Sequence, residues 1–60
     1  MSGMRFDFKF KIKDAVKMLI LGGVGRVVSI RILADYPEYE VRYFNNGESK
    51  CVWFFEDELE

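Results

Sequence analysis

Apolar and charged residues alternate strictly near the start of the chain. The charged positions hold an aspartate and three lysines, and the apolar positions are Phe6, Phe8, Phe10 and Ile12. A period of two is typical of a β-strand that has one buried face and one face in solvent. We therefore expect an N-terminal strand or arm over residues 5–12. Its lysines suit an edge of the sheet or a face exposed to solvent.

Residues 14–21 fit two kinds of element. A helix would begin at Asp14 as its N-cap and end at Gly22, but only seven residues lie between these two positions. That length is short for a helix, so both elements stay open and the strand is favoured. The apolar face of such a strand would hold Val16, Met18 and Ile20.

Three glycines in residues 22–25 predict a tight turn, because glycine adopts positive φ at no steric cost. A phosphate-binding loop would also need a Lys-Ser/Thr pair or a following helix. Instead, residues 26–33 are rich in β-branched side chains and predict a strand. One face of this strand would carry Val28, Ile30 and Ile32.

The only proline of the chain, Pro37, lies within residues 34–38 and is expected to break this strand. Alternation resumes over residues 39–44, which predicts another strand. Its two faces would carry Tyr39, Val41 and Tyr43 on one side and Glu40 and Arg42 on the other.

The sequence Asn45-Asn46-Gly47 is a strong hairpin signal, since Asn and Gly tolerate the positive φ of twisted two-residue turns. Residues 49–55 would then return as the partner strand. Side chains alternate between the faces of a strand, so Trp53 and Phe54 point to opposite sides. We therefore expect at least one of these two side chains to face the surface.

The chain ends in an acidic stretch, residues 56–60, which predicts a short helical or 3₁₀ turn with Leu59 as its apolar anchor. Together these segments make four or five short strands, with glycine and proline turns and no long helical period. This pattern is typical of a small sheet that curls to hide its edges. We therefore expect an all-β fold, a small SH3-like barrel of four to five antiparallel strands, formed by residues 1–60 as a single domain.

The composition narrows the chemistry that the protein can perform. The chain has 60 residues, 17% of them aromatic, with a single cysteine, Cys51, and no histidine. One cysteine forms no intrachain disulfide, and without histidine it supplies neither a usual zinc site nor a nucleophile–base pair. We therefore expect no metal, no cofactor, no catalytic residues and no enzymatic activity.

Nine basic and ten acidic residues give the chain a net charge of −1. Proteins that bind nucleic acid usually carry a clear basic excess, so this balance argues against such a partner. Some small β-barrels nevertheless bind single strands, with aromatic rings that stack on bases and basic residues along the backbone. As an alternative function, single-strand binding would use Arg26, Arg31, Arg42 and Lys50.

The longest apolar run, residues 18–21, is far shorter than the ~20 residues that span a bilayer. The first residues also lack the apolar stretch of a signal peptide. The expected location is therefore the cytoplasm, without attachment to a membrane.

Several short motifs between residues 10 and 60 resemble the pattern of a family of small phage and prophage proteins. That pattern runs G/K-D-x-V, then G-x-x-G-x-V, then Y-x-V-R-Y, and ends in W-(W/F)-x-E-x-x-L-E. The matching segments here are Asp14-Ala-Val-Lys, Gly22 to Gly25 with Arg26-Val-Val-Ser, Tyr39-Glu-Val-Arg-Tyr43, and Trp53 with Glu56-Asp-Glu-Leu-Glu60. Most members are functionally uncharacterised. The resemblance implies an SH3-like or Tudor-like barrel, a phage or prophage origin and the host cytoplasm as the location.

The chain departs from this pattern in three places. Lys13 stands where glycine is usual, residues 30–33 are more apolar, and Phe6-Asp-Phe-Lys precedes the shared region. An added edge strand with exposed aromatic residues can pair with another chain, so this arm suggests a homodimer. The expected dimer interface comprises Phe6, Phe8 and Phe10.

The resemblance also implies a mode of binding, because SH3-like barrels commonly bind proteins through aromatic side chains beside acidic loop residues. The chain supplies such side chains around the predicted hairpin and in its acidic end. We therefore expect a protein-binding module whose partner is a host or virion protein. Its expected contact residues are Tyr36, Tyr43, Trp53, Phe54, Glu56 and Asp57.

Overall fold

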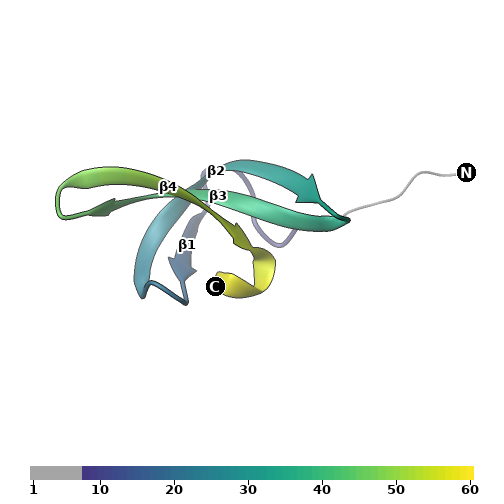
Figure 1. The fold of residues 1–60 in the computed structure, drawn as a ribbon, viewed down its shortest axis with the longest axis horizontal. Helices are drawn as coiled ribbons and strands as arrows, with labels where there is room; N and C mark the ends of the chain where they lie inside the picture. Colours follow the sequence, from purple (N-terminus) through teal and green to yellow (C-terminus); the bar gives the residue numbers. More distant parts are fainter. Residues whose placement is uncertain (1–7) are drawn as a thin grey trace, which may run out of the picture.

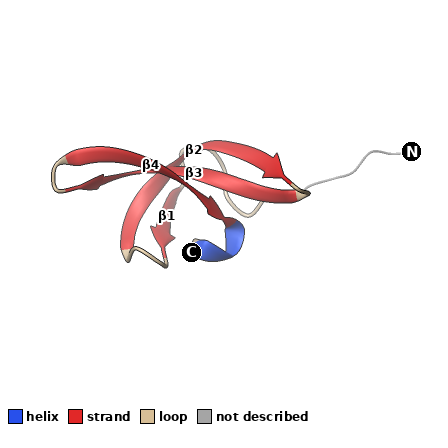
Figure 2. Ribbon diagram, viewed as in Figure 1, coloured by secondary structure: helices blue, strands red, loops and turns tan. Residues whose placement is uncertain are grey.

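The computed structural model describes residues 8–60, which form one curled antiparallel sheet and a single turn of 3₁₀ helix (Figure 1, Figure 2). Each strand pairs with its neighbours in sequence, so the sheet order is β1-β2-β3-β4. The elements are β1 (Ala15–Met18), β2 (Gly23–Leu33), β3 (Tyr36–Asn45), β4 (Glu48–Phe55) and η1 (Glu56–Glu58). The expected all-β class is confirmed, and the described residues contain no α-helix.

The favoured strand over residues 14–21 is present but shorter, because β1 ends at Met18. The chain then reverses, with Gly22 at φ +79° and its N–H donating to the Met18 carbonyl at 2.7 Å. Only glycine adopts this backbone region at no steric cost. The expected glycine turn is therefore displaced, since Gly23 already opens β2 and pairs with Met18.

A β-bulge bends β2 in the middle and changes the faces predicted for it. The pairing register with β3 shifts between Val27 and Ser29. Val27 is completely buried, whereas Val28 is exposed. The predicted apolar face that began at Val28 is therefore wrong at that position, because an extra residue in one strand re-aims its side chains.

Gly25 lies at a close approach of β2 to β3. A Cβ atom at this position would overlap Cγ1 of Val41 and lie 2.9 Å from the Arg42 carbonyl oxygen. Glycine in a strand often marks such a close approach of two backbones. The absence of a side chain at Gly25 therefore permits the curl of the sheet.

Two hairpins with two-residue turns join β2 to β3 and β3 to β4. Asn46 and Gly47 have φ values of +54° and +78°, as the type I′ turn of a twisted hairpin requires. This confirms the hairpin predicted from the sequence. The other turn consists of Ala34 and Asp35, with φ values of +50° and +69°.

Pro37 lies inside β3 rather than in a break between strands, so the expected interruption over residues 34–38 is confined to two residues. Pro37 pairs with Ile32 of β2, while β4 reaches only as far as Glu38. Leu33 and Tyr36 close the turn and form a hydrogen-bonded pair. Because hydrogen-bonded pairs alternate along the strand, the ring nitrogen of the next residue, Pro37, points away from β2. No strand follows on that side, so the missing N–H breaks no ladder bond.

The core occupies the concave face of the sheet, where the predicted Tyr39 and Val41 are completely buried. Tyr43, on the same predicted face, is only partly buried and packs against the edge of this cluster. Leu59 is also buried, which confirms its role as the apolar anchor of the chain end. The whole cluster contains Phe10, Val16, Met18, Val27, Tyr39, Val41, Phe54 and Leu59.

The predicted N-terminal strand over residues 5–12 is wrong for residues 8–12, which form bends and a turn; residues 5–7 lie outside the described part. The Phe8 and Phe10 rings contact the Tyr39 ring edge-on, with centroids 6.5 and 5.3 Å away. Phe8 and Phe10 therefore pack against one buried ring rather than lining a sheet. Lys11 donates its N–H to Oδ2 of Asp14 at 2.9 Å, which closes the turn before β1.

The end of the chain lies beside the outer edge of β1 (Figure 1). Lys17 and Glu60 exchange two backbone hydrogen bonds of 2.8 and 2.9 Å, and Leu19 donates to the Glu58 carbonyl at 3.0 Å. Met18 and Leu59 form an isolated antiparallel bridge. These contacts cover the β1 edge with a short segment, while the four named strands form an open sheet.

Candidate functional site

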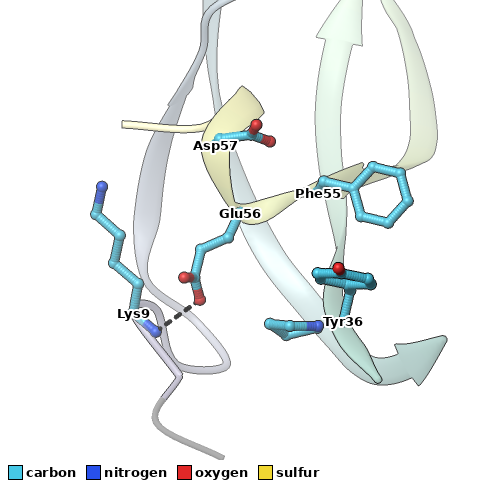
Figure 3. Close-up of a pocket in the computed structure, with 6 residues that line it drawn as sticks. Lys9, Tyr36, Phe55, Glu56 and Asp57 are labelled. Atoms are coloured by element: carbon cyan, nitrogen blue, oxygen red, sulfur yellow. Dashed lines mark hydrogen bonds between the residues drawn. The ribbon is translucent and has the colours of Figure 1, made fainter. Parts of the chain in front are cut away.

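An open groove of about 520 Å³ lies beside the turn that joins β2 to β3 (Figure 3). Its residues come from the N-terminal segment, the start of β3, the end of β4 and η1. They are Lys9, Tyr36, Pro37, Phe55, Glu56 and Asp57. The groove thus combines aromatic, acidic and basic side chains from four separate segments.

The lengths of β3 and β4 create the apolar side of this groove. β4 ends with Phe55 opposite Glu38, so the first residues of β3 extend beyond it. The Tyr36 side chain is 65% exposed and the Phe55 side chain is 42% exposed. In Figure 3 the Tyr36 and Phe55 rings lie on one side of the groove, and Glu56 and Lys9 lie on the other.

A hydrogen-bond network fixes Glu56 on the polar side. Oε2 of Glu56 accepts a 2.6 Å bond from the Tyr39 hydroxyl and a 3.1 Å bond from the Lys9 backbone N–H. The Tyr39 hydroxyl in turn accepts from the N–H groups of Lys9 at 3.0 Å and Phe10 at 3.5 Å. The network ties the N-terminal segment to β3 and η1, so this wall of the groove is held in place before any ligand binds.

Burial raises the pKa of the Tyr39 hydroxyl above its usual 10.0, because the charged phenolate is poorly solvated there. The hydrogen bond to Glu56 and the negative charge of that carboxylate raise the pKa further. The backbone N–H groups of Phe10 and Lys9 act in the opposite direction, since they favour the phenolate. Tyr39 is therefore a neutral hydrogen-bond donor at ordinary pH.

Asp57 supplies an exposed carboxylate at the rim of the groove. The only ion pair within residues 8–60 joins Arg31 to Glu38, so Asp57 has no cationic partner in this part of the chain. The Lys9 ammonium lies 5.4 Å from the centroid of the Phe10 ring. The Asp57 carboxylate is thus available to a cationic group of a ligand.

Three of the six predicted contact residues meet in this groove, namely Tyr36, Glu56 and Asp57. Phe54 does not, because it is only 4% exposed and belongs to the core, and its expected role as a contact residue is therefore wrong. Tyr43 lines a separate hollow of about 240 Å³ together with Phe44.

Trp53 lies on the convex face of the sheet, opposite Glu40. The Arg31 guanidinium carbon lies 4.0 Å from the centroid of the Trp53 ring, and Nε of Arg31 contacts Oε1 of the buried Glu38 at 2.7 Å. Cation–π attraction and the ion pair hold the arginine over the indole. The expected division of Trp53 and Phe54 between two faces is confirmed, and what covers the Trp53 ring is a side chain of the same chain.

Sequence reasoning missed three groove residues, which are Lys9, Pro37 and Phe55. The alternation of β4 already placed Phe55 on the side away from Phe54, which was the available signal. Lys9 and Pro37 carried no comparable signal, because their positions depend on the Tyr39 network and on how far β3 extends beyond β4.

The four basic residues of the nucleic-acid alternative do not form one surface. Arg26 and Arg42 lie directly opposite each other on the convex face. Arg31 is engaged by its acidic and aromatic partners, and Lys50 lies opposite Tyr43, on the concave side. Nε of Arg42 also donates to Oγ of Ser49 at 2.8 Å.

The residues of the expected dimer interface also separate. Phe10 is buried in the core and Phe8 is 42% exposed, whereas Phe6 lies outside the described residues. Phe10 therefore needs no cover from a second chain. Within residues 8–60, no cluster of three or more potential metal ligands occurs. No helix in that part of the chain has the length and apolar character needed to cross a bilayer.

Comparison of the chain with protein-family models, with curated proteins and with solved structures gave no match. The fold and the groove therefore establish only that residues 8–60 are almost entirely β-structured and carry a groove lined by aromatic, acidic and basic side chains.

Proposed function

We propose that this protein is a non-enzymatic binding module that holds a segment of a partner protein in the groove beside η1. The observation that carries this proposal is the pair of exposed rings, Tyr36 and Phe55, facing carboxylates across one groove. Half-exposed aromatic side chains are enriched where proteins bind one another, because they bury a large area with little loss of rotamer freedom.

The chemistry of the groove selects the kind of segment that it binds. Tyr36, Pro37 and Phe55 offer an apolar surface, and Asp57 offers a negative charge that pairs with no cation among residues 8–60. A complementary segment therefore carries an apolar side chain next to a lysine or arginine. The network around Glu56 holds one wall in place, which reduces the ordering cost of binding.

The proposal extends to the architecture and the origin of the chain. The bridge between Met18 and Leu59 and the bonds between Lys17 and Glu60 support a minimal SH3-like barrel, in which the chain end serves as a last short strand. The motif resemblance supports a phage or prophage protein. Its partner would then be a host or virion protein in the host cytoplasm.

Selection of binders from a random peptide library tests the groove. Peptides enriched on the full chain are expected to combine a basic residue with an apolar one, and their affinity is then measured by fluorescence anisotropy. Tyr36→Ala and Asp57→Asn should each weaken binding at least about tenfold, equivalent to ~1.4 kcal/mol. Both side chains are exposed, so their replacement should leave thermal unfolding nearly unchanged.

Phe44→Ala is the matched control, because Phe44 is a 72% exposed ring that lies outside this groove. Its affinity for the selected peptides should equal that of the unmodified protein. Failure to enrich any peptide would reject the proposal, as would peptides that lose affinity with Phe44→Ala but not with Tyr36→Ala.

Single-stranded nucleic acid is the second candidate, favoured by the placement of Arg26 directly opposite Arg42. Like charges in directly opposed strand positions are destabilising, and an anion between them removes that cost. Phe44, two residues further along β3, adds an exposed ring on which a base could stack. Arg26→Gln should then weaken binding of oligothymidylate in a salt-dependent manner. Absence of any binding at low salt rejects this candidate.

A further inference from the structure

The two edges of the sheet differ in how they are covered. The chain end pairs with the outer edge of β1 through Lys17 and Leu19. β4, at the opposite edge, pairs only with β3 within the described residues. An uncovered edge strand offers a row of backbone donors and acceptors to another strand. The free edge of β4 is thus a second interaction surface, separate from the groove proposed to bind a partner.

The hairpin geometry shows which backbone groups face outward. Asn45 and Glu48 close the two-residue turn and therefore form a hydrogen-bonded pair. Every second residue of β4 after Glu48 also forms its backbone hydrogen bonds with β3. The residues between them direct N–H and C=O away from the sheet. At one end of this row, the Phe55 N–H donates to Oε1 of Glu58 at 2.7 Å, as this alternation requires. The residues left open are Ser49, Cys51 and Trp53.

We propose that β4 pairs antiparallel with β4 of a second copy, about a twofold axis at Cys51. In this register Cys51 lies opposite Cys51 of the second copy. Ser49 of each copy lies opposite Trp53 of the other copy. All three open residues of each chain then find open residues opposite them. An antiparallel hydrogen-bonded pair exchanges two bonds, so three such pairs supply about six backbone bonds.

The neighbouring registers are worse for identifiable reasons. Two neighbouring registers also keep the convex faces of both sheets on the same side, and in each of them the twofold axis moves by one residue along β4. One of them places Lys50 opposite Lys50, which opposes two like charges. The other places Ser49 opposite Phe55, whose N–H is already donated to Glu58. The register centred on Cys51 instead places Lys50 opposite Val52, so no like charges face each other.

Cys51 makes this register directly testable, because it is exposed and is the only cysteine of the chain. Opposed residues of a hydrogen-bonded pair have Cα atoms about 5.5 Å apart, within the range that a disulfide spans. Diamide, which takes up the two electrons and two protons of the two thiols, should therefore convert the full chain into a covalent dimer. The control is a double variant, Cys51→Ser with Phe44→Cys, which places the single cysteine at an exposed site on β3. It should give little cross-linking, because Phe44 does not lie on the proposed axis.

Sedimentation tests the backbone pairing independently of the thiol. Cys51→Ser should remain a dimer of twice 7.1 kDa under reducing conditions, since its backbone groups are unchanged. Cys51→Pro should be a monomer with an unchanged circular dichroism spectrum, because the N–H that it removes points away from β3. A monomeric unmodified protein up to millimolar concentration would overturn the proposal. A dimer that survives in folded Cys51→Pro would overturn it as well, by placing the interface elsewhere.

Discussion

At the scale of single residues, Tyr39 connects more of the structure than any motif around it suggests. Its ring is completely buried and makes T-shaped contacts with Phe8 and Phe10, and its hydroxyl joins the N-terminal segment to Glu56. A buried hydroxyl without partners costs about 1–3 kcal/mol, so the network is needed to make the burial favourable. The same contacts that stabilise the core therefore also shape one wall of the groove.

The raised pKa of Tyr39 predicts a loss of stability at high pH. Above about pH 10 the unfolded chain releases the phenolic proton while the folded chain retains it, so the unfolding free energy falls as pH rises. This stability is fully present below the unfolded pKa of Tyr39 and is lost as pH rises toward the folded pKa. Urea unfolding measured from pH 8 to pH 11 should show this decline.

Tyr39→Phe is the control for this pH dependence. It should be less stable than the unmodified protein at pH 8, because Glu56 and two backbone N–H groups lose a partner. Its decline above pH 10 should nevertheless be shallower, since the hydroxyl whose pKa is raised by folding is absent. Equal slopes for the two proteins would contradict the assigned role of the hydroxyl.

Gly25 provides a second prediction at this scale. Gly25→Ala should destabilise the protein by about 1–3 kcal/mol, because its Cβ would overlap Val41 and press on the Arg42 carbonyl. Gly23→Ala is the matched control, since a Cβ there meets only the Met18 methyl at 3.5 Å, an ordinary contact. Chemical denaturation of both variants checks the difference. Similar costs for the two would show that the close approach at Gly25 does not restrict the sheet.

At the scale of elements, the short segment after η1 covers an edge that would otherwise be open. Leu59 is buried and bridges to Met18, so Leu59→Ala should cost about 2–5 kcal/mol. In a chain this small, a loss of that size is a large part of the total stability. Thermal unfolding should therefore show a much lower midpoint or no cooperative transition.

Leu33→Ala serves as the comparison for this variant, because Leu33 is a leucine in β2 that is about half exposed. Its midpoint should lie within a few degrees of that of the unmodified protein, since about half of the Leu33 surface already faces water. If the two leucine variants unfolded alike, the segment after η1 would not be part of the core.

The elements that were predictable are those whose cause is local. Asn46 and Gly47 have the backbone freedom that a two-residue hairpin needs, and the alternation of Trp53 and Phe54 follows from strand geometry alone. The conformation of residues 8–12 was not predictable, because a phenylalanine at every second position fits a strand and also fits packing around one buried ring, as Phe8 and Phe10 pack around Tyr39. The bulge after Val27 depends on how β2 meets two different strands, which no short window of sequence records.

The candidate site divides in the same way. Glu56 and Asp57 were expected from their acidic cluster beside aromatic residues, and both line the groove. Phe55 and Pro37 join them only because β3 extends beyond the end of β4, which is a property of the pairing register. Trp53 was expected to contact a partner, and the structure adds that Arg31 from β2 lies over its ring. Contacts between strands thus decided which exposed aromatic side chains remained available.

At the scale of the whole molecule, the sheet has one covered edge and one open edge. The chain end protects β1, and the described part of the chain contains no segment that pairs with the free edge of β4. A small domain with few buried side chains gains relatively more from each added surface than a large one. Self-association through β4 would therefore act on stability as well as on assembly.

That coupling predicts a melting temperature that depends on protein concentration. At concentrations where sedimentation shows the dimer, each tenfold increase in protein concentration raises the apparent free energy of unfolding by ~1.4 kcal/mol per dimer, or half of that per chain. For a domain of this size, the midpoint of thermal unfolding should rise by about 3–5 °C per decade. Cys51→Pro removes the outward N–H on the proposed axis and should melt at one temperature at every concentration. A concentration-independent midpoint in Cys51→Ser would contradict the pairing, because that variant keeps every backbone group of the edge.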